Sequence, residues 1–127
     1  MDMEPLKINK TDLTPKVILD KKANKFLIEG NSYPENVKAF YSSIVSWIDE
    51  YIEDPNDKTR IEFKLNYYNS SSSKVIYEML KRLTKILKNG KEIEIIWYYR
   101  PDDDDIKEAG KDLAAIISIP VILKEFS

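Results

Sequence analysis

Residues 59–88, TRIEFKLNYYNSSSSKVIYEMLKRLTKILK, contain the two patterns that decide the fold. From Thr59 to Tyr68 apolar and polar side chains alternate, with Tyr67 on the apolar face and Tyr68 on the other, which is typical of a strand. From about Lys74 to Lys88 apolar residues recur at helical spacing. Four serines separate the two patterns. The stretch therefore predicts a strand followed by a helix.

The rest of the chain repeats this change of period. Two short β-prone runs precede a helical pattern that extends from Pro34 to about Glu53. After residue 88 come a strand over Lys91–Tyr99, a helix that starts in an acidic run, and a last strand over Ile119–Leu123. The predicted order is β-β-α-β-α-β-α-β, and it implies an α/β fold with a mixed sheet of about five strands covered by helices.

Length and composition fit one domain over residues 1–127, with residues 1–10 as a loosely ordered or edge-strand segment. The chain has 127 residues, of which 43% are hydrophobic, and this suffices for one core. Its apolar runs are too short to cross a bilayer. The opening Met1–Pro5 lacks the basic and then apolar profile of a signal peptide, so we expect a cytoplasmic protein that does not bind membranes.

The sequence contains no Cys and no His. Without Cys there is no disulfide, no thiolate nucleophile and no Cys-ligated metal centre. Without His there is no imidazole base, and the commonest transition-metal ligand is missing. These exclusions favour a binding or regulatory protein without a cofactor over an enzyme.

The serine tract, Ser70–Ser73, lies where a strand is expected to end and a helix to begin. Ligands of open α/β sheets gather at the carboxyl ends of the strands, and a helix N-terminus favours an anion. A phosphate on one of these serines would be partly stabilised there, with Lys74 close by. Ser and Asn are also the preferred N-cap residues. The residues alone favour capping but leave a phosphorylation site open.

The acidic tract, Asp102–Asp105, has three interpretations. Its carboxylates could ligate Mg²⁺ or Ca²⁺, although their spacing matches no calcium loop. Asp is also common at the cap and in the first turn of a helix, which is the interpretation that we favour. An acidic surface for a partner is the third.

Two further features of the sequence could serve binding. From Lys74 to Lys91 the charge is +5, which nucleic-acid binding could use. Because the whole chain has a net charge of −2, we expect a solvated helix face and no nucleic acid. Tyr68 and Tyr98 stand near strand ends and could line a contact surface.

Three segments together are similar to a known family. They are Gly30–Asn36, Tyr67–Lys74, and Trp97–Tyr99 with the acidic tract and Glu108–Asp112. In this order and spacing they resemble the SiaC family of bacterial regulatory phosphoproteins, over about residues 11–123. The resemblance implies a fold like that of STAS (anti-anti-sigma-factor) domains. It also implies a partner-switching role in signal transduction.

The resemblance further implies which molecules act on the chain. These are a Ser/Thr protein kinase, a PP2C-type phosphatase, and a diguanylate cyclase that the unphosphorylated form binds and activates, promoting cyclic-di-GMP synthesis and biofilm formation. The family's phosphoacceptor follows the Asn of the strand-to-helix segment, and that position is Ser70 here. Ser71 and Ser72 are the less favoured alternative phosphoacceptors.

Our hypothesis is a non-enzymatic phospho-switch in which a phosphate on Ser70 disfavours docking of a partner. The predicted partner-binding surface comprises Tyr68, Asn69, Ser71, Ser72, Lys74, Asp102, Asp103, Asp104 and Asp105. The alternative is a small metal- or nucleotide-binding enzyme that uses the acidic tract.

Overall fold

The computed structural model describes residues 3–127. Met1 and Asp2 lie outside this range, so the expectations drawn from Met1–Pro5 and from residues 1–10 fall partly outside the described residues. The helices are α1 (Val37–Tyr51), α2 (Ser70–Leu83), α3 (Lys85–Lys88) and α4 (Asp104–Ile116). The strands are β1 (Leu6–Ile8), β2 (Lys16–Asp20), β3 (Lys25–Ser32), β4 (Lys58–Tyr68), β5 (Glu92–Tyr99) and β6 (Val121–Glu125).

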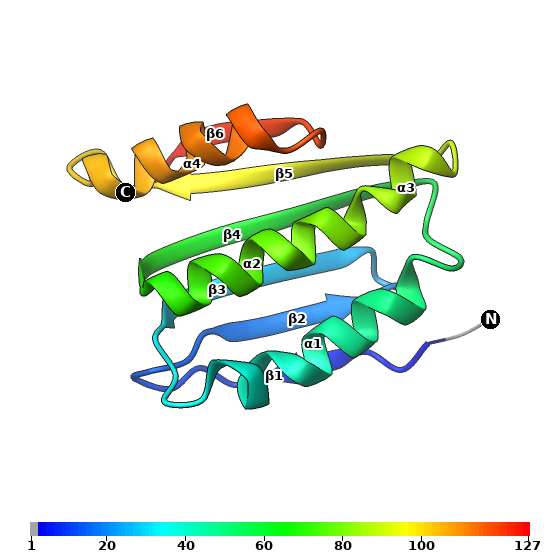
Figure 1. Ribbon diagram of the computed structural model, residues 1–127, viewed down its shortest axis with the longest axis horizontal. Coiled ribbons are helices and arrows are strands. Elements are labelled where there is room, and N and C mark those ends of the chain that lie inside the picture. Colours follow the sequence, from blue (N-terminus) through cyan, green and yellow to red (C-terminus); the bar gives the residue numbers. More distant parts are fainter. Residues whose placement is uncertain (1–2) are drawn as a thin grey trace.

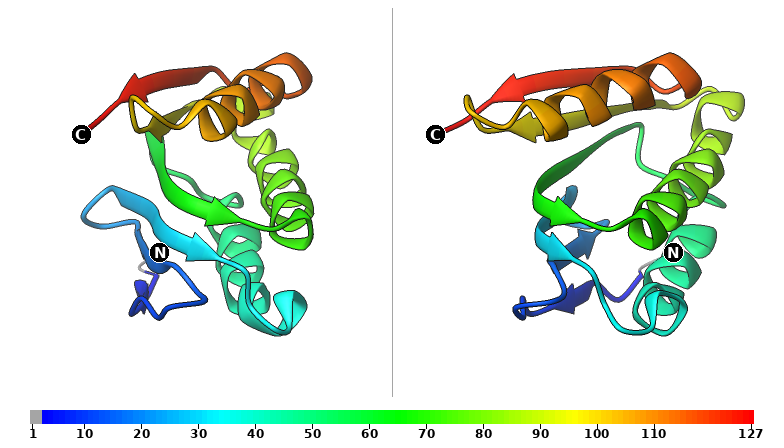
Figure 2. Two further views of the ribbon diagram at one scale, coloured as in Figure 1. Left: turned by 90° about the vertical axis from the view of Figure 1, so that its left-hand side faces the viewer. Right: turned by 60° about the vertical axis from the view of Figure 1, so that its left-hand side comes forward.

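The strands form one mixed sheet whose spatial order, β1-β2-β3-β4-β5-β6, follows the chain (Figure 1). The first three strands are antiparallel, and β3 to β6 are parallel. Because parallel crossovers are right-handed, three successive crossovers in one direction bring α1, α2 and α4 to the same face of the sheet. Figure 2 shows these helices on one side, with the other face of the sheet open. The predicted mixed α/β fold is confirmed.

The sheet has six strands where the sequence predicted about five. The additional strand is β1, which pairs with β2 through Leu6↔Leu19 and Ile8↔Val17. Trp47 of α1 donates an indole N–H to the carbonyl oxygen of Glu4 at 2.9 Å, and this bond holds the segment before β1. A strand of three residues is too short to produce a visible alternation in the sequence.

The core lies between the sheet and its helices. Ile28, Phe63 and Trp97 are register partners across β3, β4 and β5, and all three are buried. Tyr41 and Ile44 of α1 are buried against the same layer. Removing this apolar surface from water is the main favourable contribution to folding.

Helix α2 begins four residues earlier than predicted. Its first turn consists of the serine tract itself, and Asn69 caps it by accepting the Ser72 backbone N–H at 2.9 Å. The predicted helix to Lys88 is broken at Thr84, whose hydroxyl donates to the Lys81 carbonyl oxygen, and α3 follows. Serine has only moderate helix propensity, but at a helix N-terminus its hydroxyl is favourable.

A bulge in β4 reverses the expected directions of two tyrosines. Gly30 pairs with Leu65, but its neighbour Asn31 pairs with Tyr67, so Asn66 is the additional residue. Because side chains alternate along a strand, one extra residue moves the following side chains to the opposite faces. Tyr67 is therefore 54% exposed, and Tyr68 turns toward the helices, where its ring contacts Trp97.

Candidate functional site

Two helices begin side by side at the carboxyl ends of neighbouring parallel strands. Asn69 caps α2 after β4, and Asp103 caps α4 after β5 by accepting the Ile106 backbone N–H at 3.0 Å. Trp97 of β5 donates its indole N–H to the Ile106 carbonyl oxygen at 2.8 Å, which fixes the first turn of α4 against the sheet. The serine tract and the acidic tract thus face each other across the ends of β4 and β5.

A groove of about 480 Å³ lies between the two tracts. It is bounded by the last residues of β4 and the first turns of α2 and α4. The lining residues are Asn66, Tyr67, Tyr68, Asn69, Ser70, Ser73, Asp103, Asp105 and Ile106. The groove therefore combines tyrosine rings, serine hydroxyls and two carboxylates, a set suited to contact with another protein.

The four serines differ in their surroundings because helical geometry turns each to a different direction. Ser70 and Ser73, three positions apart, are exposed and line the groove. Ser71 is exposed and does not line it. Ser72 is fully buried. The structure therefore places Ser72 in the core and not on the surface to which the sequence assigned it, whereas the identity of the phosphoacceptor stays a prediction.

Ser72 ends a chain of three buried hydroxyl groups. The Ser32 hydroxyl of β3 donates to Ser72 Oγ at 2.8 Å, and Ser32 Oγ lies 2.6 Å from the Tyr41 hydroxyl oxygen of α1. Burial raises the pKa of the Tyr41 phenol above its usual value, and the hydrogen bonds from Ser32 and Ser72 counter part of this shift. The chain satisfies three polar groups in the core and ties α2 to β3 and α1.

Tyr68 lines the groove and packs against β5. Its ring meets the Trp97 ring edge-on, with centroids 6.2 Å apart. Burial raises the pKa of the Tyr68 hydroxyl, and the negative charges of Asp112 and Asp103 raise it further. The hydroxyl therefore stays protonated and can donate a hydrogen bond to a bound group.

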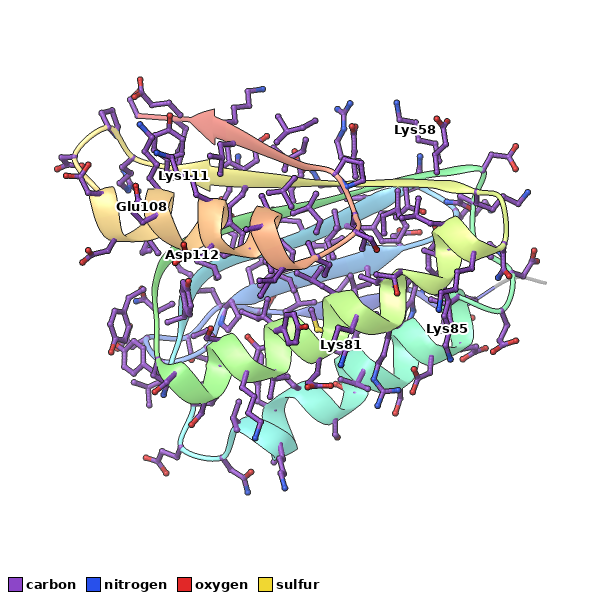
Figure 3. The ribbon with its side chains drawn as sticks, turned by 45° about the horizontal axis from the view of Figure 1, so that its top comes forward. Lys58, Lys81, Lys85, Glu108, Lys111 and Asp112 are labelled. Carbon is purple, nitrogen blue, oxygen red and sulfur yellow. The ribbon has the colours of Figure 1, made fainter. Side chains whose placement is uncertain are left out.

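A second groove, of about 300 Å³, continues between α2 and α4 and shares Tyr68 and Ser73 with the first. Its other lining residues are mainly apolar: Ile76, Tyr77, Trp97, Ala109, Asp112, Leu113 and Ile116. In Figure 3 Asp112 lies on the side of α4 that faces α2. The two grooves together form a surface that is polar at the helix N-termini and apolar farther along.

The acidic tract divides between the groove and the solvent. Asp103 and Asp105 line the groove, whereas Asp102 and Asp104 are exposed outside it. Among residues 3–127 no group of three Asp or Glu side chains is placed to hold a metal ion. The Asp103 carboxylate is engaged as a helix cap.

The basic residues of α2 and α3 lie away from the groove. Lys74 is exposed and does not line it. Arg82 makes a two-pronged ion pair with Asp49 of α1, at 2.7 and 2.9 Å. Lys81 and Lys85 extend along the outer side of the helices (Figure 3). No helix within residues 3–127 is long and apolar enough to cross a membrane.

Sequence reasoning missed several residues of the site. Asn66, Tyr67 and Ser73 line the first groove, and Ile76 and Asp112 line the second. The signal for Ser73 was available, because residues three apart share a helix face. The signal for Asn66 and Tyr67 was not, because it depends on the bulge in β4.

Comparisons with known proteins agree with this architecture. The family model described as "SiaC family regulatory phosphoprotein" matches residues 8–126. An uncharacterized protein of Pseudomonas aeruginosa (strain UCBPP-PA14) is 25% identical over 122 residues, which are 96% of this chain and 97% of that protein.

Solved structures are similar over nearly the whole chain. SiaC of P. aeruginosa has a TM-score of 0.88 at 24% identity, covering 98% of this chain and 100% of that chain. A chain in the crystal structure of diguanylate cyclase SiaD in complex with its activator SiaC, from the same organism, has a TM-score of 0.89 at 24% identity, covering 95% and 99%. Apo-SiaC of P. aeruginosa has a TM-score of 0.86 at 25% identity, covering 96% and 99%.

Proposed function

The chain belongs to the SiaC family of regulatory phosphoproteins, and on this premise we propose that it is a cytoplasmic, non-enzymatic, single-domain phospho-switch with Ser70 as its phosphoacceptor. A Ser/Thr kinase adds the phosphate and a PP2C-type phosphatase removes it. The unphosphorylated form binds and activates a diguanylate cyclase, as the solved complex of SiaD with its activator SiaC suggests by analogy.

The observation that carries the proposal is the position of Ser70. It is the first residue of α2, it is exposed, and it lines the groove with Asp103 and Asp105 of the neighbouring helix. A kinase can reach an exposed hydroxyl at this position without unfolding the core. The buried Ser72 does not meet that requirement.

Phosphorylation of Ser70 would change the charge of the groove. A phosphoserine carries about −1.5 to −2 charges at pH 7 and would lie at the N-terminus of α2, where the helix dipole partly stabilises it. The same phosphate would add to the negative charge of Asp103 and Asp105. A partner that fits the unphosphorylated groove would then meet like-charge repulsion and a larger desolvation cost.

Intact-mass analysis with the cognate kinase tests the phosphoacceptor. We expect the wild-type chain and Ser71→Ala to gain one phosphate and Ser70→Ala to gain none. Ser71→Ala is the matched control, because Ser71 is exposed in the same helical turn but does not line the groove. Phosphate on Ser70→Ala would overturn the assignment.

A cyclase assay tests the switch. We expect Ser70→Ala and Ser71→Asp to stimulate cyclic-di-GMP synthesis like the unphosphorylated wild type, and Ser70→Asp to lose most of the stimulation. Equal stimulation by Ser70→Asp and Ser70→Ala would contradict a switch at this position.

A further inference from the structure

The face of the sheet opposite the helices also carries a concave feature. Strands β3, β4 and β5 present Glu29, Lys64 and Tyr98 on this open face, which no helix covers (Figure 2). A hollow of about 260 Å³ lies there, at the carboxyl ends of β3 and β4. It is lined by Lys10, Glu29, Gly30, Lys64, Asn66, Arg100 and Phe126.

Three cationic side chains in and beside the hollow, Lys64, Arg100 and Lys124, contact aromatic rings. The Lys64 ammonium lies 4.6 Å from the centre of the Tyr98 ring, and the Lys124 ammonium lies 5.8 Å from it. The Arg100 guanidinium lies 5.0 Å from the centre of the Phe126 ring. The two rings meet edge-on at 5.7 Å. Cation–π contacts of this kind orient a charge without neutralising it.

The third cation of the hollow is Lys10, whose position depends on Gly30. The φ of Gly30, +123°, is one that other residues rarely adopt, and the Lys10 side chain passes directly over this glycine. A Cβ atom at this position would lie 3.3 Å from Lys10 Cδ, closer than carbon atoms normally approach. The absence of a side chain at position 30 therefore lets Lys10 lie over the rim of the hollow.

These cations lack carboxylate partners, unlike the cations near the amino ends of β3 and β4 on the same face. There Arg60 pairs with Glu94 at 2.8 Å and Lys25 pairs with Glu62 at 3.8 Å. Within residues 3–127 no carboxylate oxygen lies within 4.0 Å of the side-chain nitrogens of Lys10, Lys64, Arg100 or Lys124. The only acid among the described lining residues is Glu29.

We propose that this cationic hollow, formed by Lys10, Lys64, Arg100 and the ring of Phe126, is a second docking site, which takes an acidic segment of a partner protein. Charge complementarity carries the choice of occupant, because three cations face one carboxylate. The volume is below the roughly 300–1,000 Å³ of pockets for drug-sized ligands, so it suits side chains presented by a larger molecule.

A nucleic acid fits this surface less well than an acidic peptide does. The cationic hollow shares Asn66 with the groove that contains Asp103 and Asp105, so a long polyanion that leaves the hollow would meet these carboxylates. The whole chain also has a net charge of −2. Short runs of Asp or Glu avoid this repulsion. The proposal does not rest on the phosphorylation of Ser70.

Amide chemical-shift titration tests the site with a defined probe, an eight-residue peptide in which glutamate alternates with serine, at about 0.01 M salt. We expect saturable shifts at Lys64, Tyr98 and Arg100. The double variant Lys64→Glu/Arg100→Glu should weaken binding at least about tenfold. The control Lys85→Glu/Lys88→Glu makes the same change in net charge on α3 and should alter the affinity by less than about twofold.

Several outcomes would overturn the proposal. They are no saturable shift, shifts centred elsewhere, equal binding of a peptide with glutamine in place of glutamate, equal effects of the two double variants, or equal binding of inorganic phosphate or of a single-stranded oligonucleotide. If Lys64→Glu/Arg100→Glu does not fold, Lys64→Gln and Arg100→Gln replace it. Each should weaken binding about threefold, and unchanged affinity in both would overturn the site.

Discussion

The serine tract and the acidic tract are built alike and used differently. Each has four identical residues, follows a parallel strand and lies at the start of a helix, and each helix has a side-chain cap. In the serine tract the third residue, Ser72, is turned into the core. In the acidic tract all four residues keep contact with solvent, and the first buried side chain of α4 is Ile106.

The difference follows from what each side chain costs to bury. A hydroxyl can be buried when neighbouring hydroxyls satisfy it, as Ser32 and Tyr41 do here, whereas an ionised carboxylate needs a counter-ion as well. A run of serines can therefore supply a structural residue and exposed reactive residues in the same turn. A run of aspartates supplies only caps and surface charge.

The largest effect on stability should come from replacing the buried hydroxyl of the serine tract, that of Ser72, with a charged group. Ser72→Asp should lower the free energy of unfolding by about 3 kcal/mol or more, because a carboxylate would be buried without a cation. Ser71→Asp, in the same turn but exposed, should change it by less than about 0.5 kcal/mol. Urea denaturation measures both. Equal stability of the two variants would show that Ser72 is not buried in solution.

The next largest effect should come from the helix of the acidic tract. A Cβ atom on Gly110 would lie 2.5 Å from Leu123 Cδ2 and would also collide with the Trp97 indole. Gly110→Val should therefore destabilise the fold by about 1–3 kcal/mol through overpacking. Ala115→Val, on the exposed side of the same helix, is the control and should cost less than about 1 kcal/mol. Thermal unfolding distinguishes the two, and equal melting temperatures would contradict close packing of α4 on β5 and β6.

The two helix caps should contribute nearly equally to stability. In this respect the two tracts are most alike. Asn69→Ala and Asp103→Ala each remove the acceptor for a backbone N–H and should each cost about 1 kcal/mol. Asn69→Asp keeps an acceptor and should cost less. Asp102→Ala changes an exposed residue of the acidic tract outside the cap and serves as the control. A loss on Asp102→Ala equal to that on Asp103→Ala would mean that charge, and not capping, stabilises α4.

The smallest effect should be electrostatic and lies between the two tracts. The pKa of Tyr68 is raised above the usual 10.0, first by burial and then by Asp112 and Asp103. Because the pKa of Tyr68 is higher in the folded state than in the unfolded state, its protonated hydroxyl stabilises the fold below about pH 10. This contribution to the free energy of unfolding is lost as the pH rises through the folded-state pKa. Phenolate absorbance, compared with Tyr68→Phe, reports this ionisation. Asp112→Asn should lower the pKa of Tyr68, and an unchanged pKa would show that the carboxylate does not act on it.

Most of the fold could be predicted from the sequence because it rests on long periodic segments. The alternation in β4 and the helical spacing in α1 each involve enough residues to outweigh local exceptions. The true start of α2 was missed, since serine favours several local conformations, and β1 was left open between loose order and an edge strand, since three residues show no period. At both places tertiary contacts decide the structure.

For the site, the sequence predicted which segments lie together but not the direction of each side chain. The order of parallel strands was enough to bring Ser70 and the acidic tract to one edge of the sheet. The alternation of β4 predicted that Tyr68 would point away from the apolar face, and the bulge at Asn66 reversed this. The burial of Ser72 depends on Ser32, which lies 40 positions earlier in the chain, and no local pattern reports such a partner.

The strand order, which follows the chain from β1 to β6, has a consequence for the newly made protein. Each strand after β1 pairs with one that has already left the ribosome, so the domain can assemble progressively from its N-terminal end. The hydroxyl chain is complete once Ser72 has emerged, but the groove must wait for Asp103 and the rest of α4. We therefore expect a nascent chain to anchor α2 before the groove between the two tracts is complete.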